Sequence, residues 1–285
     1  MAYDLTSKTV IVSGAGRGLG QAMAVGLARA GASVVALDIE EARLDETLKL
    51  AADAGVAGPV RARACDVADV KSCEDVVAFA LKELGSLHGV INCAGLGMAF
   101  LDPDFHAKPI RFWEADTGRW QQIVDVNLRG PFLLARAATP HLLAQKWGRI
   151  VNVTTSFNTM IRGANMPYGQ TKAGLEAATN SWSEDLEGTG VTANVLIPGG
   201  AADTRMIPYE SPYDRTKLVK PEAMVAPAQW LMSEHSDGVT GMRFIGRDWD
   251  PQADWREALK AAGSPAAWPE LASGALSGQP VKMTK

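Results

Sequence analysis

Residues 9–20, TVIVSGAGRGLG, lead from a run of β-branched residues through a glycine-rich turn into a helical pattern. Thr9–Ser13 predicts a buried strand, and the apolar spacing of residues 19–30 predicts a helix that ends at Gly31. Glycines in such a turn let backbone N–H groups and the helix N-terminus approach a pyrophosphate. The turn therefore predicts a dinucleotide-binding loop, formed by Gly14, Arg17, Gly18, Leu19 and Gly20.

Acidic residues after two later strands extend this prediction. Asp38 ends the predicted strand Ser33–Asp38, where a carboxylate can accept hydrogen bonds from the adenosine ribose. Asp66 and Val67 follow the third predicted strand, where they could border an adenine. The Asp38 carboxylate would repel a 2′-phosphate and therefore favours NAD, whereas the Arg17 guanidinium could reach that phosphate and keeps NADP open.

Strands and helices alternate along most of the chain, which predicts an α/β fold. We expect a single doubly wound Rossmann-type domain, with a parallel sheet of about seven strands and helices on both faces. Residues 1–248 form this domain in the prediction, and residues 249–285 form a C-terminal extension packed on the domain or on a neighbouring subunit. The later predicted strands are Val60–Cys65, Val90–Cys93, Arg149–Val153, Val191–Ile197 and Met242–Ile245, and the later predicted helices span about Val70–Leu84, Thr117–Gln145 and Pro167–Glu187.

The composition excludes several classes of protein. The 285 residues include 28 basic and 32 acidic side chains, and the net charge of −4 leaves no broad electrostatic footprint for nucleic acid. No apolar run approaches the ~20 residues of a membrane helix, and the first residues lack the apolar region of a signal peptide. Three cysteines without paired spacing are typical of reduced thiols, and four scattered histidines predict no metal site. We therefore expect a cytoplasmic protein with neither a nucleic-acid nor a membrane partner.

Tyr168 and Lys172 lie four residues apart at the start of a predicted helix, directly after Pro167. This spacing places the phenol and the ammonium on one face of the helix. A free tyrosine ionises near pH ~10, and an adjacent cation lowers such a pKa by roughly 1–3 units. The pair therefore predicts a tyrosine that can donate or accept a proton.

These residues occur with other short motifs in a fixed order: Ser13-Gly14-x-x-x-Gly18-x-Gly20, Asp66-Val67, Asn92-Cys93-Ala94-Gly95, Asn127, Tyr168-x-x-x-Lys172 and Pro198-Gly199. From about Lys8 to Gly246 the chain resembles a classical member of the short-chain dehydrogenase/reductase (SDR) family. The resemblance implies that Tyr168 is the general acid/base, that Lys172 holds the nicotinamide ribose and lowers the tyrosine pKa, and that Asn127 anchors a water in a proton relay. It also implies cofactor contacts by Asn92, Ala94, Gly95, Tyr168, Lys172, Pro198 and Gly199.

A proline four residues after Asn127 adds a physical argument for that water. Pro131 has no N–H, so in a helix the Asn127 carbonyl would lose its usual partner. A free carbonyl at a helix kink is a natural place for a water. We expect this water to link Lys172 to solvent.

Some positions depart from the family pattern. Ser13 stands where the family usually has Thr, and Cys93 replaces a second Asn. The position of the family's catalytic Ser holds Thr155, whose hydroxyl can still polarise a carbonyl, and the neighbouring Ser156 is the alternative. Thr204 is the nearest match to the Thr that contacts the nicotinamide amide, although the stretch before it is one residue longer than usual.

The implied function is NAD(P)-dependent, reversible hydride transfer between a nicotinamide and a secondary alcohol or ketone, with Tyr168 as general acid/base and Thr155 positioning the oxygen. Aromatic residues in the segments 96–116 and 206–218 fit an apolar or aromatic small molecule better than a phosphorylated sugar, whereas Arg162 and Arg205 keep an anionic substrate open. Two alternatives stay open: an NADPH-dependent ketone reductase with the same site, and a non-catalytic protein that senses dinucleotides. The resemblance also implies a homo-oligomer, either a dimer or a tetramer.

Overall fold

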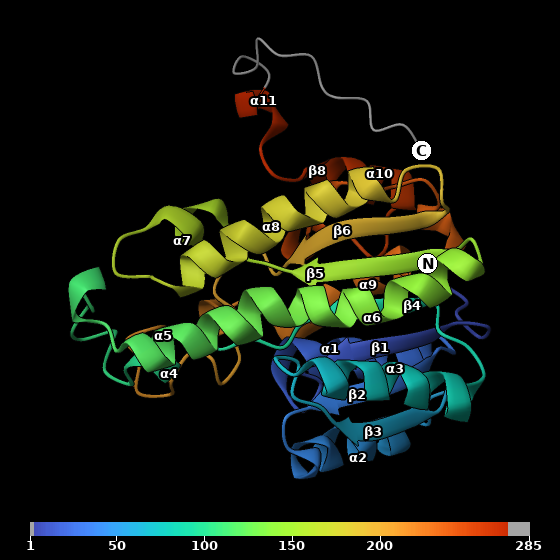
Figure 1. Ribbon diagram of the computed structural model, residues 1–285, viewed down its shortest axis with the longest axis horizontal. Helices are drawn as coiled ribbons and strands as arrows, with labels where there is room; N and C mark the ends of the chain where they lie inside the picture. The colour runs from blue at the N-terminus through green and yellow to red at the C-terminus, as the bar shows by residue number, and fades with distance from the viewer. Residues whose placement is uncertain (1–2, 273–285) are drawn as a thin grey trace.

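The sheet has eight strands in the order β3-β2-β1-β4-β5-β6-β7-β8 (Figure 1). The computed structural model describes residues 3–272. The strands from β3 to β7 pair in parallel, as predicted, whereas β8 pairs antiparallel with β7. The strands are β1 (Thr9–Ser13), β2 (Ser33–Asp38), β3 (Val60–Ala64), β4 (Gly89–Asn92), β5 (Gly148–Val153), β6 (Val191–Ile197), β7 (Met242–Ile245) and β8 (Gly263–Pro265).

Helices cover both faces of the sheet, which confirms the doubly wound arrangement (Figure 1). Val10 and Val12 of β1 pack into a core with α1 and α9, whereas Ile11 between them packs into a second core with α3 and α6. Successive side chains of a strand point to opposite faces, so a strand with a core on each side is apolar along its whole length. The helices are α1 (Gly18–Arg29), α2 (Asp45–Asp53), α3 (Val70–Leu84), α4 (Met98–Leu101), α5 (Thr117–Val124), α6 (Gly130–Ala144), α7 (Phe157–Ile161), α8 (Tyr168–Asp185), α9 (Val225–Leu231), α10 (Trp255–Ala262) and α11 (Pro269–Ala272).

The helix predicted over Thr117–Gln145 is interrupted. A π-helical turn, Asp125–Arg129, joins α5 to α6, and the Gly130 N–H donates to the Asp125 carbonyl five residues earlier. Pro131 lies at the first turn of α6, where the lack of an N–H removes the regular bond to the Asn127 carbonyl. The break that the proline predicted is therefore present as a π-turn centred on Asn127.

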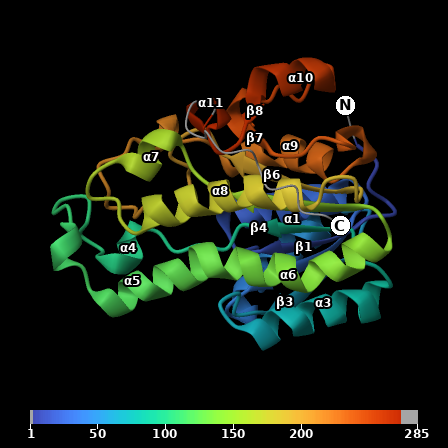
Figure 2. The same ribbon diagram turned by 45° about the horizontal axis from the view of Figure 1, so that its top comes forward.

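The region after β7 adds structure that the sequence did not predict. Strand β8 forms the edge of the sheet beside β7, and α10 lies next to it (Figure 2). Trp249 lies 5.1 Å from Trp230 of α9, between ring centroids, within the core on the α1 side of the sheet. The boundary placed at residue 248 stays a prediction, and residues 273–285 of the predicted extension lie outside the described residues.

The carboxyl ends of the parallel strands all lie at the same end of the sheet. Figure 1 shows α4, α7 and the start of α5 beyond this edge, on the side to which the β5 arrow points. In open parallel sheets, ligands bind at this edge, where the strand order reverses. Within residues 3–272, no helix has the length and apolar character that a membrane span requires.

Candidate active site

The glycine-rich loop after β1 is packed tightly against the end of β4. Gly14 and Gly18 have positive φ angles of 66° and 59°, which L-residues rarely adopt. A Cβ atom on Gly14 would lie 2.7 Å from the Ala94 Cα, and one on Gly20 would lie 2.2 Å from the Gly14 carbonyl oxygen. The Ser13 hydroxyl accepts a hydrogen bond from the Ala94 N–H at 3.1 Å. The loop therefore has no room for side chains at these glycines.

Helix α1 begins at the end of this loop. Arg17 is its exposed N-cap residue and makes no side-chain cap, and its first turn holds no acidic residue. Leu19 is partly buried and packs against the α1-side core, which fixes the helix to the sheet. A helix start of this kind presents unpaired N–H groups and attracts anions such as a pyrophosphate.

Asp38 lies at the end of β2, beside the glycine-rich loop. Its Oδ2 accepts a hydrogen bond from the Gly16 N–H at 3.2 Å, and Arg43 lies 3.6 Å from its Oδ1. Arg43 also donates to Glu40 at 2.7 Å. Arg43 was not predicted from the sequence, where its only signal is a basic residue five positions after Asp38. Its guanidinium partly offsets the acidic character of the predicted ribose site.

Asp66 and Val67 follow β3. Asp66 is exposed and its carboxylate accepts a hydrogen bond from the Ala68 N–H at 2.9 Å. Val67 is buried, and a Cβ on Gly130 would lie 2.9 Å from its Cγ2. The Asp66 side chain therefore stabilises a turn at the carboxyl edge of the sheet, while the Val67 side chain packs against the start of α6.

Thr204 meets the glycine-rich loop from the other side. A Cβ on Gly18 would lie 2.9 Å from the Thr204 Cγ2. Gly199, two residues after β6, has a φ of 92°, and the Arg247 N–H donates to the Pro198 carbonyl at 3.1 Å. The fold therefore brings the segment after β6 to the loop after β1.

The Asn127 side chain clamps the chain that follows β4. Its Oδ1 accepts from the Leu96 N–H at 2.7 Å and its Nδ2 donates to the Leu96 carbonyl at 2.9 Å. A Cβ on Gly95 would lie 3.4 Å from the Asn127 Oδ1 and 3.7 Å from the Lys172 Nζ. Gly95 thus faces Asn127 and Lys172 together. At the end of β4, Asn92 donates to the Asn152 Oδ1 at 2.8 Å and links β4 to β5.

Lys172 lies beneath Tyr168 on α8, 3% exposed, and its Nζ donates to the Val153 carbonyl at 2.8 Å. Burial lowers the pKa of Lys172 to about 8, and the nearby Cys93 thiol acts weakly in the opposite direction. Burial raises the pKa of Tyr168, and a hydrogen bond with the Thr155 side chain lowers it. The lowering contribution to the Tyr168 pKa comes from Thr155, and the Lys172 ammonium donates to a strand carbonyl. The role of Lys172 in lowering the tyrosine pKa stays a prediction.

The two candidate hydroxyls after β5 have different surroundings. A hydrogen bond from the Thr155 side chain to Tyr168 lowers the pKa of the phenol. Ser156 is the N-cap of α7: its hydroxyl accepts from the Thr159 N–H at 3.4 Å and lies 2.8 Å from the Thr159 hydroxyl. The geometry thus places Thr155 beside the phenol and commits Ser156 to a helix cap.

An apolar cluster borders Tyr168 on the side of α4 and α5. It contains the buried Met98, Leu101 and Ile123, and the partly buried Leu96, Phe100, Phe105, Ile110, Ala115, Met166 and Tyr168. Phe105 stacks on His106, with ring centroids 3.7 Å apart, and His106 contacts Tyr213 edge-on at 5.3 Å. The segments 96–116 and 206–218 therefore meet beside the candidate site.

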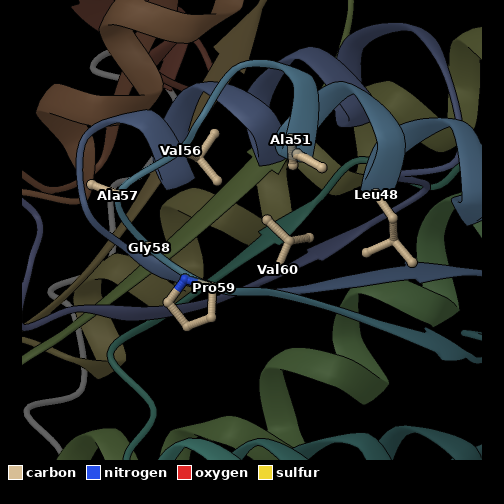
Figure 3. Close-up of a pocket in the computed structure, with 8 residues that line it drawn as sticks. Leu48, Ala51, Val56, Ala57, Gly58, Pro59 and Val60 are labelled. Atoms are coloured by element: carbon tan, nitrogen blue, oxygen red, sulfur yellow. The ribbon is translucent and has the colours of Figure 1, made fainter.

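Two hollows lie away from the Tyr168 side chain. A hollow of about 410 Å³ between α2 and the start of β3 has mainly apolar walls, including Leu48, Ala51 and Val60, and its wall carries no titratable side chain (Figure 3). A groove of about 740 Å³ adjoins the glycine-rich loop at Arg17 and Gly18 and extends along α1. Only the second hollow touches residues predicted to bind a cofactor.

Comparisons with known proteins agree with this geometry. A family model described as short chain dehydrogenase matches residues 8–213. The chain is 28% identical over 252 residues to glucose 1-dehydrogenase 2 of Bacillus subtilis, covering 85% of this chain and 93% of the relative. It is 29% identical over 252 residues to the 3-oxoacyl-(acyl-carrier-protein) reductase FabG of Thermotoga maritima, covering 86% and 97%. A solved protein from Beutenbergia cavernae with bound NADP at low occupancy is 26% identical, with a TM-score of 0.73 over 86% of this chain and 96% of that chain.

Proposed function

The chain belongs to the short-chain dehydrogenase family, and from that membership we propose an NAD-dependent oxidoreductase that interconverts a secondary alcohol and a ketone. The observation that carries the proposal is the meeting of Tyr168, Thr155 and Lys172 at the carboxyl end of β5. The glycine-rich loop and the start of α1 lie at the same edge of the sheet, so a dinucleotide bound there would extend towards the phenol.

The residues of the loop fit a dinucleotide. Gly14, Gly18 and Gly20 allow a tight turn in which any Cβ would collide with neighbouring protein atoms, and the first turn of α1 presents N–H groups without a competing carboxylate. A bound nicotinamide supplies the hydride donor or acceptor. Ala94, Gly95, Pro198, Gly199 and Thr204 would border its other end.

In the proposed mechanism, Tyr168 gives or takes the hydroxyl proton through its Oη. Thr155 donates a hydrogen bond to the same substrate oxygen and stabilises negative charge that develops there. Since burial raises the pKa of Tyr168, the phenol is protonated near neutral pH and is ready to donate in the direction of carbonyl reduction. Lys172, with a pKa of about 8, supplies a positive charge below that pH and a neutral amine above it.

We propose NAD as the preferred cofactor because two carboxylates lie at the end of β2. Asp38 binds the glycine-rich loop, and Glu40 follows two residues later. A 2′-phosphate would face both charges at a cost that ribose hydroxyls avoid. Arg43 and Arg17 favour the second candidate, an NADPH-dependent ketone reductase with the same catalytic residues, because either guanidinium could pair with that phosphate.

The proposed substrate is an apolar or aromatic secondary alcohol, or the corresponding ketone. The wall beside Tyr168 supports this choice, since it consists of Met98, Leu101, Phe105 and similar side chains.

We also propose that the enzyme is a homo-oligomer. Trp120 of α5 and Phe132 and Leu143 of α6 are 38%, 47% and 40% exposed, which leaves large apolar side chains in water along one pair of helices. Light scattering after gel filtration tests this, and a monomer at micromolar concentration would contradict it.

Absorbance at 340 nm tests the proposed reaction. Cyclohexanol and 1-phenylethanol are mixed with the protein and NAD or NADP, and cyclohexanone and acetophenone with NADH or NADPH. We expect turnover with NAD or NADH, and at least a thousandfold loss in Tyr168→Phe, which keeps the ring and removes the proton-bearing oxygen. NADH binding without turnover in either direction would instead support a dinucleotide sensor, and equal activity of Tyr168→Phe would refute the proposed mechanism.

A further inference from the structure

The end of β5 is tied to α8 by a side chain at each successive position. Asn152 donates to the Thr179 hydroxyl at 2.8 Å, and the next carbonyl, Val153, accepts from Lys172 at 2.8 Å. The following residue, Thr154, donates through its hydroxyl to Glu176 at 2.9 Å. Only Lys172 among these α8 residues was expected from the sequence. The segment that carries Thr155 is thus fixed to the helix that carries Tyr168.

Glu176 lies one turn after Lys172 and is fully buried. Its Oε2 accepts from Thr154 and forms an ion pair with Arg243 of β7, whose side chain is 12% exposed. Arg243 in turn donates through Nη2 to the Thr155 carbonyl at 2.9 Å. Glu176 and Arg243 therefore hold Thr154 by its side chain and Thr155 by its backbone.

A buried ion pair is an unusual device for stability alone. Removing two charges from water costs several kcal/mol per ion, and apolar residues of similar volume often stabilise a fold as well or better. Here the cost is increased, because the second Glu176 oxygen, Oε1, has no hydrogen-bond partner within residues 3–272. The ion pair instead fixes the Arg243 side chain, whose Nη2 donates to the Thr155 carbonyl.

We propose that Glu176 and Arg243 are positioning residues that fix the Thr155 backbone so that its hydroxyl faces the Tyr168 phenol. The inference rests on the proposed function, in which that hydroxyl binds the substrate oxygen. A displacement of about 1 Å in a catalytic group can lower a rate about 100-fold. Loss of either anchor frees one side of the Thr154–Thr155 segment, and loss of Glu176 also leaves Arg243 without its counter-charge.

The test compares Glu176→Gln and Arg243→Gln with the wild type, using whichever alcohol of the panel above turns over fastest. We expect kcat to fall about 10- to 100-fold, with KM for the cofactor changed less than about twofold. Glu184→Gln is the matched control: the same substitution on the same helix, at an exposed residue. Arg243→Lys keeps the charge and should retain part of the lost activity.

The decisive measurement is the same pair of substitutions in a Thr155→Val background. If Glu176 acts through Thr155, Glu176→Gln should lower kcat of that variant less than twofold, because there is no hydroxyl left to misplace. An equal loss in both backgrounds, or wild-type kcat in Glu176→Gln, would overturn the inference.

A failure of the proposed function gives a different pattern. In that case Tyr168→Phe is as active as the wild type, whatever Glu176 does. If Glu176→Gln does not fold, as its melting curve would show, Arg243→Lys in the two backgrounds carries the same comparison with a smaller change. Equal kcat for Arg243→Lys and wild type would then count against a positioning role.

Discussion

Replacing Lys172 with methionine removes a buried charge that lowers the stability of the folded protein. The ammonium is 3% exposed, and burial lowers its pKa from 10.5 to about 8. Because one pKa unit corresponds to about 1.4 kcal/mol, keeping this lysine charged in the fold at neutral pH costs about 3 kcal/mol. Methionine fills a similar length of space without the charge.

The sign of the pH dependence follows from this lowered pKa. The unfolded chain binds the proton more tightly than the fold, so the cost is fully present below pH ~8 and disappears as the pH rises towards 10.5. Lys172 should therefore make the wild type about 2.5 kcal/mol more stable at pH 10 than at pH 7, relative to Lys172→Met. The lost hydrogen bond to the Val153 carbonyl lowers the stability of the variant by about 1–3 kcal/mol at every pH and does not alter this difference.

Urea unfolding followed by tryptophan fluorescence measures the effect, with both proteins at one concentration and one ionic strength at pH 7, 8, 9 and 10. Lys82→Met is the control, because Lys82 is 83% exposed on α3. We expect the gap between wild type and Lys172→Met to change by about 2.5 kcal/mol across this range, and the Lys82→Met gap to change by less than about 0.5 kcal/mol. Parallel stability curves for wild type and Lys172→Met would refute the reasoning.

Three further predictions concern the site. Asp38→Ser should raise kcat/KM for NADP relative to NAD at least tenfold, because it removes the carboxylate that would face a 2′-phosphate in the proposed binding mode; an unchanged ratio in competing assays would show that Asp38 does not select the cofactor. Thr155→Val keeps the shape of the side chain without the hydroxyl, so kcat should fall about 100-fold while NADH affinity, measured by fluorescence titration, stays within about twofold. Asn127→Ala should lower kcat at saturating substrate about tenfold and lower the melting temperature by a few degrees, since the amide clamps both polar groups of Leu96; full turnover in this variant would contradict the relay role.

Strand and helix periodicity was sufficient for the parallel sheet, because apolar runs such as TVIVS and SVVALD can only be buried on both faces. Periodicity did not predict the features that depend on contacts between distant residues or on a local change in helix geometry. Strand β8 spans only Gly263–Pro265 and is held by its antiparallel pairing with β7, a long-range contact that its own three residues do not encode. The π-turn was predicted only in part: Pro131 predicted the loss of a regular helical hydrogen bond, but not the bond between residues five positions apart that forms beside it.

In the candidate site, too, spacing within one element was predictable, whereas contacts between elements were not. Motifs place Tyr168 and Lys172 on one helix face, because that depends on spacing within a single element. They do not reveal what the lysine points at, since the Val153 carbonyl belongs to a strand whose packing against α8 is a tertiary fact. Proximity along the helix suggests a cation beside the phenol, but it does not reveal burial, which is the largest influence on the Tyr168 pKa and raises it.

Two residues that belong to no sequence motif, Glu176 and Arg243, also contact the candidate site. Glu176 and Arg243 come from α8 and β7, 67 positions apart, and they meet because α8 packs on β6, the strand that pairs with β7. Their contacts converge on Thr154 and Thr155, and Thr155 is the proposed catalytic hydroxyl, where the sequence predicted a departure from the usual serine. A threonine has a stiffer side chain than a serine, so the direction of its hydroxyl depends more on where its backbone is held. A chain that uses threonine at this position therefore gains more from a charged anchor on the backbone, which is the dependence that the double substitutions measure.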